Sequence, residues 1–208
     1  MQVDAFILIG GRSSRLGHDK AFVVLGGMTL AQRAVRTVRE ALLSDCVTMV
    51  AGNSLQFATQ SIALDTPFIF DLYENRGPLG GLHAALANAS SPWIFLLACD
   101  YPFVSKELIT LLGEKIADDV GAVVPEQDDG RLQPLCAFYR VETALPKVER
   151  ILDLPRVPPP MRDVVGELSP RIVKFDEYSH LPNAANLFAN VNTVDDLQRV
   201  KDKLSVTE

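Results

Sequence analysis

The pattern that most constrains this chain is an alternation of apolar strands and helices through its first 125 residues. The strands are continuously apolar, which is typical of strands buried on both faces of a parallel sheet. Helices must then cover both faces, because the connection between two parallel strands is usually helical. We therefore predict an α/β fold of three layers with a mostly parallel sheet. The expected strands are 5–9, 46–51, 68–70, 94–98, 121–124, 135–139 and 171–175, and the expected helices are 29–43, 77–89, a helix capped by Ser105, 143–154, and one from Thr193 to about 204.

Composition indicates one globular domain over residues 1–208. With 48% hydrophobic residues the chain can bury a sizeable core, and no repeat or linker divides it. The formal net charge of −6 leaves no basic excess to neutralise a nucleic-acid backbone, so we expect no nucleic-acid partner. No apolar run reaches transmembrane length and the first residues lead straight into a strand, so we expect neither a membrane segment nor a signal peptide.

The three cysteines, Cys46, Cys99 and Cys136, are each isolated within an apolar run. We interpret them as buried thiols, because disulfide or metal ligands are usually grouped by spacing. This predicts a cytoplasmic location. The histidines share no metal-ligand spacing and no serine lies in a nucleophile elbow, so covalent hydrolase chemistry has no support.

A cluster of glycine and cationic residues follows the first predicted strand. The segment ILIGGRSSRLGHDK, residues 7–20, places Gly10 and Gly11 at the end of the strand, followed by Arg15 and Lys20. Its spacing matches neither the dinucleotide-binding loop nor the Walker A loop. Backbone amides near two glycines together with fixed positive charge suit a polyphosphate. The alternative is a solvated turn with ordinary surface charges.

Three further polar residues follow predicted strands in the same way. Asn53 comes after the second strand, Asp71 after the third, and Asp100 directly after the most hydrophobic one. Because carboxyl ends of parallel strands share one edge of a sheet, we expect these residues to lie near the glycine loop. Asp100 is the best candidate for a Mg²⁺ ligand, since a buried carboxylate needs a partner. A turn or helix-capping role before Pro102 is its alternative.

A second glycine segment, 77–81, begins a predicted helix. It allows either a tight start to the helix or close contact between the backbone and a base or ribose. The residues alone leave both open.

Four segments together carry a family likeness. LIGGRSSRLGHDK, GPLGGLHAAL, LLACDYPF and NVNTVDDL occur in this order, and the chain resembles the MobA-like nucleotidyltransferases from about residue 6 to 197. The resemblance implies a Rossmann-like nucleotidyltransferase fold. It also implies transfer of GMP from GTP to the terminal phosphate of molybdopterin, with Mg²⁺, in the cytoplasm and with release of pyrophosphate. Other molybdenum cofactor biosynthesis proteins and apo-molybdoenzymes are the further partners that it implies.

The resemblance also assigns site residues. It implies a nucleotide-binding half at about 1–125 and an acceptor half at about 126–208. The implied nucleotide-binding residues are Leu8, Ile9, Gly10, Gly11, Lys20, Asn53, Asp71, Gly80 and Asp100; the implied catalytic residues are Arg15, Lys20 and Asp100, with Asp100 on the metal; and Asn190 and Asn192 are implied on the acceptor side. The chain departs from the family pattern at Ile9, where alanine is usual, and at Asn53, which lies two residues beyond the expected asparagine.

Two other functions stay open at this point. A related cytidylyltransferase, or an enzyme acting on another small phosphate or sugar phosphate, would use the same fold; Gly11 favours guanine by family likeness. A non-catalytic nucleotide-binding protein is the alternative of another class, but Lys20 and Asp100 together favour catalysis, since binding alone needs no aligned metal. For the pterin, the sequence offers only local charge such as Arg131 or Arg162.

Overall fold

A computed structural model describes residues 2–9, 20–43, 46–52, 66–73, 76–154 and 157–205. Its strands are β1 (Val3–Leu8), β2 (Val24–Leu25), β3 (Met28–Thr29), β4 (Val47–Ala51), β5 (Phe68–Phe70), β6 (Trp93–Ala98), β7 (Ala122–Pro125), β8 (Cys136–Arg140) and β9 (Pro170–Val173). Its helices are η1 (Lys20–Phe22), α1 (Leu30–Leu42), α3 (Pro78–Ala87), α4 (Lys106–Gly113), α5 (Val141–Leu152), α6 (Met161–Gly166), α7 (Phe175–Tyr178), η3 (Ala184–Asn186) and α8 (Val194–Ser205).

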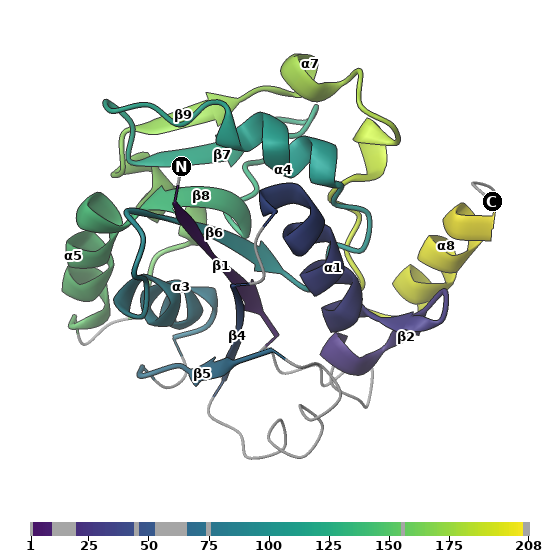
Figure 1. Cartoon of the computed structure of the whole chain (residues 1–208), viewed down its shortest axis with the longest axis horizontal. Coiled ribbons are helices and arrows are strands. Elements are labelled where there is room, and N and C mark those ends of the chain that lie inside the picture. The colour runs from purple at the N-terminus through teal and green to yellow at the C-terminus, as the bar shows by residue number, and fades with distance from the viewer. Residues whose placement is uncertain are drawn as a thin grey trace.

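The central sheet has seven strands in the order β5-β4-β1-β6-β8-β7-β9 (Figure 1). β1 pairs in parallel with β4 and β6, and β4 pairs in parallel with β5. β8 is antiparallel to both of its neighbours, β6 and β7. The predicted mostly parallel sheet is confirmed.

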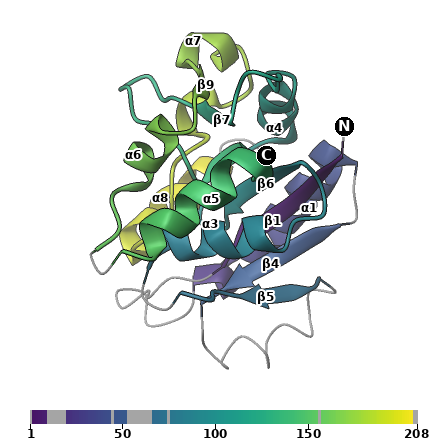
Figure 2. The same ribbon diagram turned by 90° about the vertical axis from the view of Figure 1, so that its left-hand side faces the viewer.

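Helices cover both faces of this sheet, as predicted. α1 and α4 pack on one face, and α3, α5 and α6 pack on the other (Figures 1 and 2). Successive residues of β1 and β6 face opposite sides of the sheet. Ile7 and Phe95 pack on the side of α1 and α4, and Phe6 and Leu96 pack on the side of α3, α5 and α6. Continuous hydrophobicity is therefore required, since each side of a strand meets a helix.

The start of the first long helix agrees with its sequence signal. Thr29 is the N-cap of α1, where its hydroxyl accepts from the Gln32 amide and the Gln32 side chain accepts from the Thr29 amide. Ser105 likewise caps α4. Each cap satisfies amides that have no partner within the helix.

Three expectations were wrong in detail. Cys99 and Cys136 are buried as predicted, but Cys46 is exposed because it precedes the first paired residue of β4, Val47. The predicted strand 171–175 ends at Val173, where its partner β7 also ends, and Phe175 begins α7 instead. The short helix α6 was not predicted, because its six residues follow a proline run and give little periodicity.

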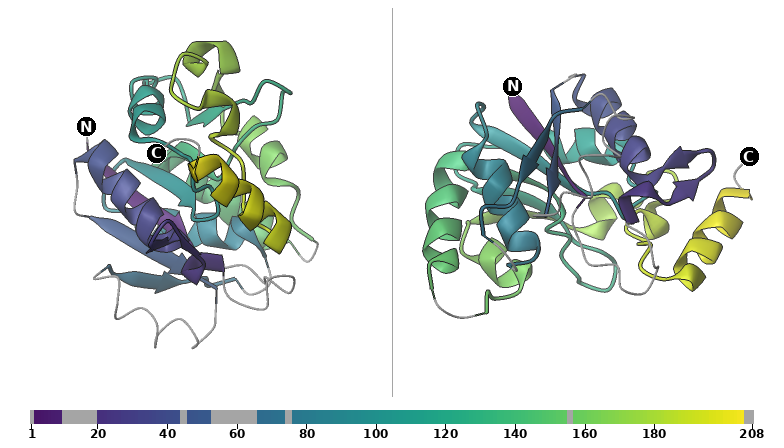
Figure 3. Two further views of the ribbon diagram at one scale, coloured as in Figure 1. Left: turned by 90° about the vertical axis from the view of Figure 1, so that its right-hand side faces the viewer. Right: turned by 90° about the horizontal axis from the view of Figure 1, so that it is seen from below.

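The C-terminal helix, α8, packs against elements from the N-terminal part of the chain. α8 lies beside the β2–β3 hairpin and the start of α1 (Figure 3), and Val200 shares a small apolar cluster with Leu25 and Leu30. This packing brings the residues just before α8 to the carboxyl edge of the sheet, where β1 and β6 end. Among the described residues, no helix has the length and apolar character needed to cross a membrane.

Candidate active site

Asp100 lies just beyond the carboxyl end of β6, a strand that is buried along its whole length. Every residue of β6 is buried, and the Cys99 amide continues the ladder by donating to the Leu8 carbonyl at 3.1 Å. The Asp100 side chain emerges at this edge with 22% of its surface exposed, and one of its oxygens lies 3.6 Å from the Lys20 Nζ. Burial raises the pKa of Asp100 above its usual value, and the charge of Lys20 opposes that rise. A partly buried carboxylate is thus held in place by one cation.

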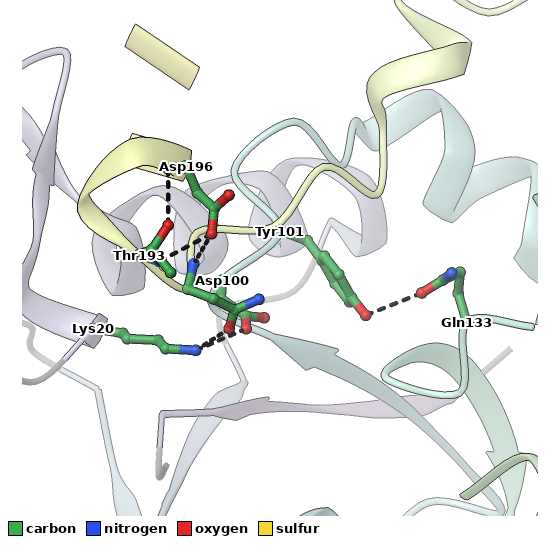
Figure 4. Close-up of polar contacts among 7 residues, drawn as sticks. Lys20, Asp100, Tyr101, Gln133, Thr193 and Asp196 are labelled. Carbon is green, nitrogen blue, oxygen red and sulfur yellow. Dashed lines mark hydrogen bonds and ion pairs between the residues drawn. The ribbon is translucent and has the colours of Figure 1, made fainter. Parts of the chain in front are cut away.

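Lys20 joins three distant segments of the chain. It begins η1, forms the ion pair with Asp100, and donates a hydrogen bond from Nζ to the side-chain oxygen of Asn192 (Figure 4). The contacts of Lys20 bring the start of η1, the end of β6 and the segment before α8 together at one edge. We name Lys20, Asp100 and Asn192 the edge triad.

Asn192 is fixed from both sides. The amide of its neighbour Val191 donates to the Asp100 carbonyl at 3.1 Å. The amides of Asn192 and Thr193 both donate to the Asp196 carboxylate, and the Asp196 amide donates to the Thr193 hydroxyl at 3.1 Å (Figure 4). These contacts form a capping box that starts α8, as the sequence predicted for Thr193. The amide oxygen that meets Lys20 is therefore preorganised.

Asp71 lies after β5, at the same edge. Its amide donates to the Ala51 carbonyl at 3.1 Å, while its Oδ1 is buried and has no hydrogen-bond partner among the described residues. Burial raises the pKa of Asp71 to about 6. An unpartnered buried oxygen of this kind is unfavourable without a ligand that donates to it.

Two glycines of α3 allow this crowding. A side-chain carbon at Gly80 would lie 3.3 Å from Asp71 Oδ2, and one at Gly81 would lie 2.8 Å from Leu8 Cδ2. A side chain at either position would crowd Asp71 or the end of β1, and glycine avoids this crowding. Packing within the fold therefore explains two glycines of the 77–81 segment, Gly80 and Gly81, with no need for a bound ligand.

The other predicted site residues have varied positions. Leu8 and Ile9 are buried, so their side chains belong to the core and only their backbone is available at the edge. Asn190 is exposed and has no bond to the edge triad among the described residues. Gly10, Gly11, Arg15 and Asn53 lie outside the described residues, and their roles stay predictions.

Two residues of this edge escaped the sequence analysis. Tyr101 follows Asp100, and its hydroxyl donates to the side-chain oxygen of Gln133 at 3.0 Å (Figure 4). Gln133 is 8% exposed and is one of the few buried polar residues among those described. The proximity of Tyr101 to Asp100 in the sequence was a usable signal, but nothing local marked Gln133.

The donor set suits a hard divalent cation. Mg²⁺ in nucleotide enzymes is commonly bound through one or two carboxylates and the phosphates of the substrate, and Asp100 provides a carboxylate at the open end of a rigid strand. Among the described residues, no group of three or more His, Cys, Asp or Glu side chains could hold a metal ion. The assignment of Asp100 as a Mg²⁺ ligand stays a prediction.

A parallel sheet with charged and amide side chains at its carboxyl edge defines a nucleotide-binding α/β protein. Residues 5–167 match the family model of the MobA-like NTP transferase domain, and the chain belongs to this family of nucleotidyltransferases. It is 32% identical over 200 residues to the molybdenum cofactor guanylyltransferase of Desulfosudis oleivorans, covering 96% of this chain and 94% of that protein. The family predicted from the sequence is confirmed.

Solved structures agree with this assignment. The molybdopterin-guanine dinucleotide biosynthesis protein A of Archaeoglobus fulgidus superposes with a TM-score of 0.80 at 26% identity, covering 98% of this chain and all of that one (100%). A cytidylyltransferase from Leptospira borgpetersenii reaches a TM-score of 0.73 at 12% identity, covering 99% of this chain and 87% of that one. The latter likeness shows the shared fold alone.

Proposed function

We propose that this protein transfers GMP from GTP to the terminal phosphate of molybdopterin and releases pyrophosphate. The observation that carries the proposal is the edge triad: a lysine, a carboxylate and an amide from three distant segments held together at the carboxyl edge of the sheet. The family supports a nucleotidyl transfer, and the names of its relatives support guanylyl transfer to a molybdenum cofactor. A purely binding protein would not need this combination.

The chemistry needs charge neutralisation more than a base. A phosphate monoester is already mostly dianionic near neutral pH, so the attacking oxygen has no proton to lose. The obstacle is repulsion between the attacking phosphate and the triphosphate. Lys20 is placed to neutralise that charge and the charge that develops on pyrophosphate. Arg15 would add a second cation, as the sequence predicts.

Asp100 would hold Mg²⁺ at this edge. When bound, Mg²⁺ neutralises phosphate oxygens and aligns the α-phosphate with the attacking group. Asp100 would contribute a carboxylate ligand, and Lys20, at the same edge, would contact the phosphates. Asn192, fixed by the α8 capping box, would keep Lys20 at this edge.

Asp71 supports guanine as the base. Guanine offers two adjacent N–H donors, N1–H and its 2-amino group, which a carboxylate can accept together, whereas cytosine offers one amino group beside an acceptor. The unpartnered oxygen of Asp71 lies close to the first residues of α3, where a base could rest against the glycines. Binding of guanine would satisfy that oxygen.

We place the reaction in the cytoplasm, with other molybdenum cofactor biosynthesis proteins and apo-molybdoenzymes as partners. The family resemblance supports this location, and no disulfide joins Cys46, Cys99 or Cys136 in the described part of the chain. Cytoplasmic proteins usually keep their cysteines reduced.

A two-step experiment tests the proposal. The first step measures thermal stabilisation by GTP, CTP, ATP and UTP, each with Mg²⁺, and we expect GTP to give the largest shift. The second supplies GTP and molybdopterin and measures pyrophosphate and the dinucleotide product. A preference for CTP would contradict guanylyl transfer, and GTP binding without any transfer to molybdopterin would contradict the acceptor.

A further inference from the structure

The connection between β7 and β8 lies beside the edge triad. β8 runs antiparallel to β6, with Cys136 opposite Leu97, so β8 begins where β6 ends. The Ala98 amide donates to the Leu135 carbonyl at 2.8 Å and extends this pairing towards Asp100. Residues 126–133, which we call the β7–β8 segment, therefore lie at the carboxyl edge. The proposed function assigns them no role.

The β7–β8 segment is tied to the residue after Asp100. Tyr101 donates to Gln133 Oε1 at 3.0 Å, and Gln133 Nε2 donates onward to the side-chain oxygen of Gln127 (Figure 4 shows the first bond). Burial and the charge of Asp100 raise the pKa of Tyr101, and the charge of Arg131 opposes that rise.

Internal bonds give the β7–β8 segment a defined shape. The Gln127 amide donates to the Arg131 carbonyl at 2.9 Å, and Gly130, with a φ of 80°, closes the turn. The Tyr178 hydroxyl donates to the Glu126 carbonyl at 2.8 Å from another element. A segment held at both ends can present a side chain in a fixed place.

Arg131 is the side chain that this turn presents. Its side chain is 71% exposed, and its guanidinium pairs with Asp129, Nε to Oδ2, at 2.6 Å. An exposed ion pair of this kind contributes only about 0–1 kcal/mol, so an incoming phosphate can replace Asp129 at little cost. A guanidinium also binds phosphate through two parallel hydrogen bonds.

We propose that the β7–β8 segment forms the acceptor side of the site, with Arg131 binding the anionic phosphate of the acceptor and Tyr101 and Gln133 acting as positioning residues. This inference rests on the proposed function and names where its second substrate binds. Arg162, the other cation considered from the sequence, pairs at 3.4 Å with its neighbour Asp163 on α6, outside the β7–β8 segment. Arg131 is favoured because it belongs to the turn that Gln133 and Gln127 tie to Tyr101.

Substrate kinetics of the full chain test the role of Arg131. GTP and molybdopterin are varied separately, with Mg²⁺ present. For Arg131→Ala we expect the KM for molybdopterin to rise about tenfold or more, as for loss of one charge-assisted contact, with the KM for GTP within about twofold of wild type. Arg150→Ala is the matched control. Arg150 lies on α5, its side chain is 70% exposed, and it pairs with Glu167 at 3.0 Å. We expect no change there.

The positioning pair has its own matched control. Tyr101→Phe and Gln133→Leu should each raise the KM for molybdopterin about threefold to tenfold while leaving the KM for GTP unchanged. Tyr139→Phe also removes a buried hydroxyl that donates to a nearby backbone carbonyl, that of Pro134 at 2.7 Å, and should leave both constants near wild type. A merely structural role would move Tyr139→Phe and Tyr101→Phe alike.

The outcomes separate this inference from the proposed function. If wild-type protein transfers GMP to molybdopterin and Arg131→Ala has an unchanged KM for it, the role of Arg131 is wrong and the proposed function stands. Equal rises in both KM values would also contradict an acceptor-side role. If wild-type protein binds GTP but transfers nothing to molybdopterin, the proposed acceptor fails and this inference fails with it.

Discussion

Aspartates at the amino ends and at the carboxyl ends of the central strands have opposite surroundings. We call these two sides of the sheet its amino edge and its carboxyl edge. Asp4, near the amino end of β1, accepts four hydrogen bonds from the amides and hydroxyls of Ser90 and Ser91. Burial would raise the pKa of Asp4, but these donors together outweigh it and lower the pKa. At the carboxyl edge, burial dominates: the pKa values of Asp71 and Asp100 are raised, and Asp71 Oδ1 has no partner among the described residues.

The contrast teaches how to recognise a site from its donors. A carboxylate with a full set of donors completes the fold, whereas one that the fold leaves short of partners is ready for a cation or a ligand N–H. Size is a poorer guide. A hollow of about 820 Å³ lies at the amino edge and is lined in part by Asp4, Ser90 and Ser91, whose polar groups already satisfy one another.

The largest effect should come from removing Asp100. We expect Asp100→Ala to lower turnover at least about a thousandfold, because the metal ligand at the reacting phosphate is lost. The fold should persist, since loss of a partly buried carboxylate with a raised pKa costs little stability. Dinucleotide formation measures the first claim, and circular dichroism with thermal melting the second. Normal activity in a folded Asp100→Ala protein would contradict the metal assignment.

Removing the cation of the edge triad should have the next largest effect. We expect Lys20→Met to lower kcat about a hundredfold, because one source of charge stabilisation is lost and others remain. Asn192→Ala should cost only about tenfold, since Asn192 acts through Lys20. Single-turnover rates at saturating GTP measure both. A larger loss in Asn192→Ala than in Lys20→Met would reverse the roles that we give them.

The site could be predicted from sequence where its residues follow strands. Lys20 and Asp100 were found because glycine, cation and carboxylate come directly after apolar runs, and parallel pairing brings those ends together. Asn192 was found by resemblance, and its position depends on the packing of α8 against Leu25 and Leu30. The meeting of Lys20 with Asp100 thus follows from topology, whereas the position of Asn192 depends on packing between distant segments.

Other features depend on contacts that no local pattern contains. The Tyr101–Gln133 bond joins residues 32 positions apart, and an isolated glutamine carries no periodic signal. The end of β9 is set by the end of its partner β7, so apolar Phe175 was assigned to the wrong element. The buried state expected for Cys46 failed for a similar reason, because pairing of β4 begins one residue later.

A smaller effect should appear as a pH dependence of GTP binding. The pKa of Asp71 is raised to about 6, so the carboxylate that accepts from guanine should be mostly protonated at pH 5. We expect GTP to bind about tenfold more weakly at pH 5 than at pH 7.5. Titration calorimetry with Mg²⁺ measures this. The control is Asp71→Asn, which should bind weakly at both values.

The raised pKa of Asp71 also predicts a pH dependence of folding stability. Stability should fall as pH rises, whereas GTP binding should strengthen. Its folded pKa lies above the ordinary value, so the folded state holds the proton more tightly than the unfolded state. This contribution to stability is fully present below about pH 4 and is lost as pH rises through about 6. Asp71→Asn should therefore flatten this part of the stability profile, and an unchanged profile would contradict the raised pKa.

The smallest effect on activity should come from Asp4, where stability changes instead. Asp4→Asn removes the charge that its four donors surround, and we expect unfolding to become easier by about 1–3 kcal/mol at pH 7. Because the folded pKa of Asp4 is lowered, this stabilisation is present above its ordinary value and is lost in wild type as pH falls through the folded pKa. Urea unfolding across pH measures the difference, and kcat and both KM values should stay within about twofold. A loss of activity with unchanged stability would mean that the amino edge takes part in the reaction, and the contrast between the two edges would fail.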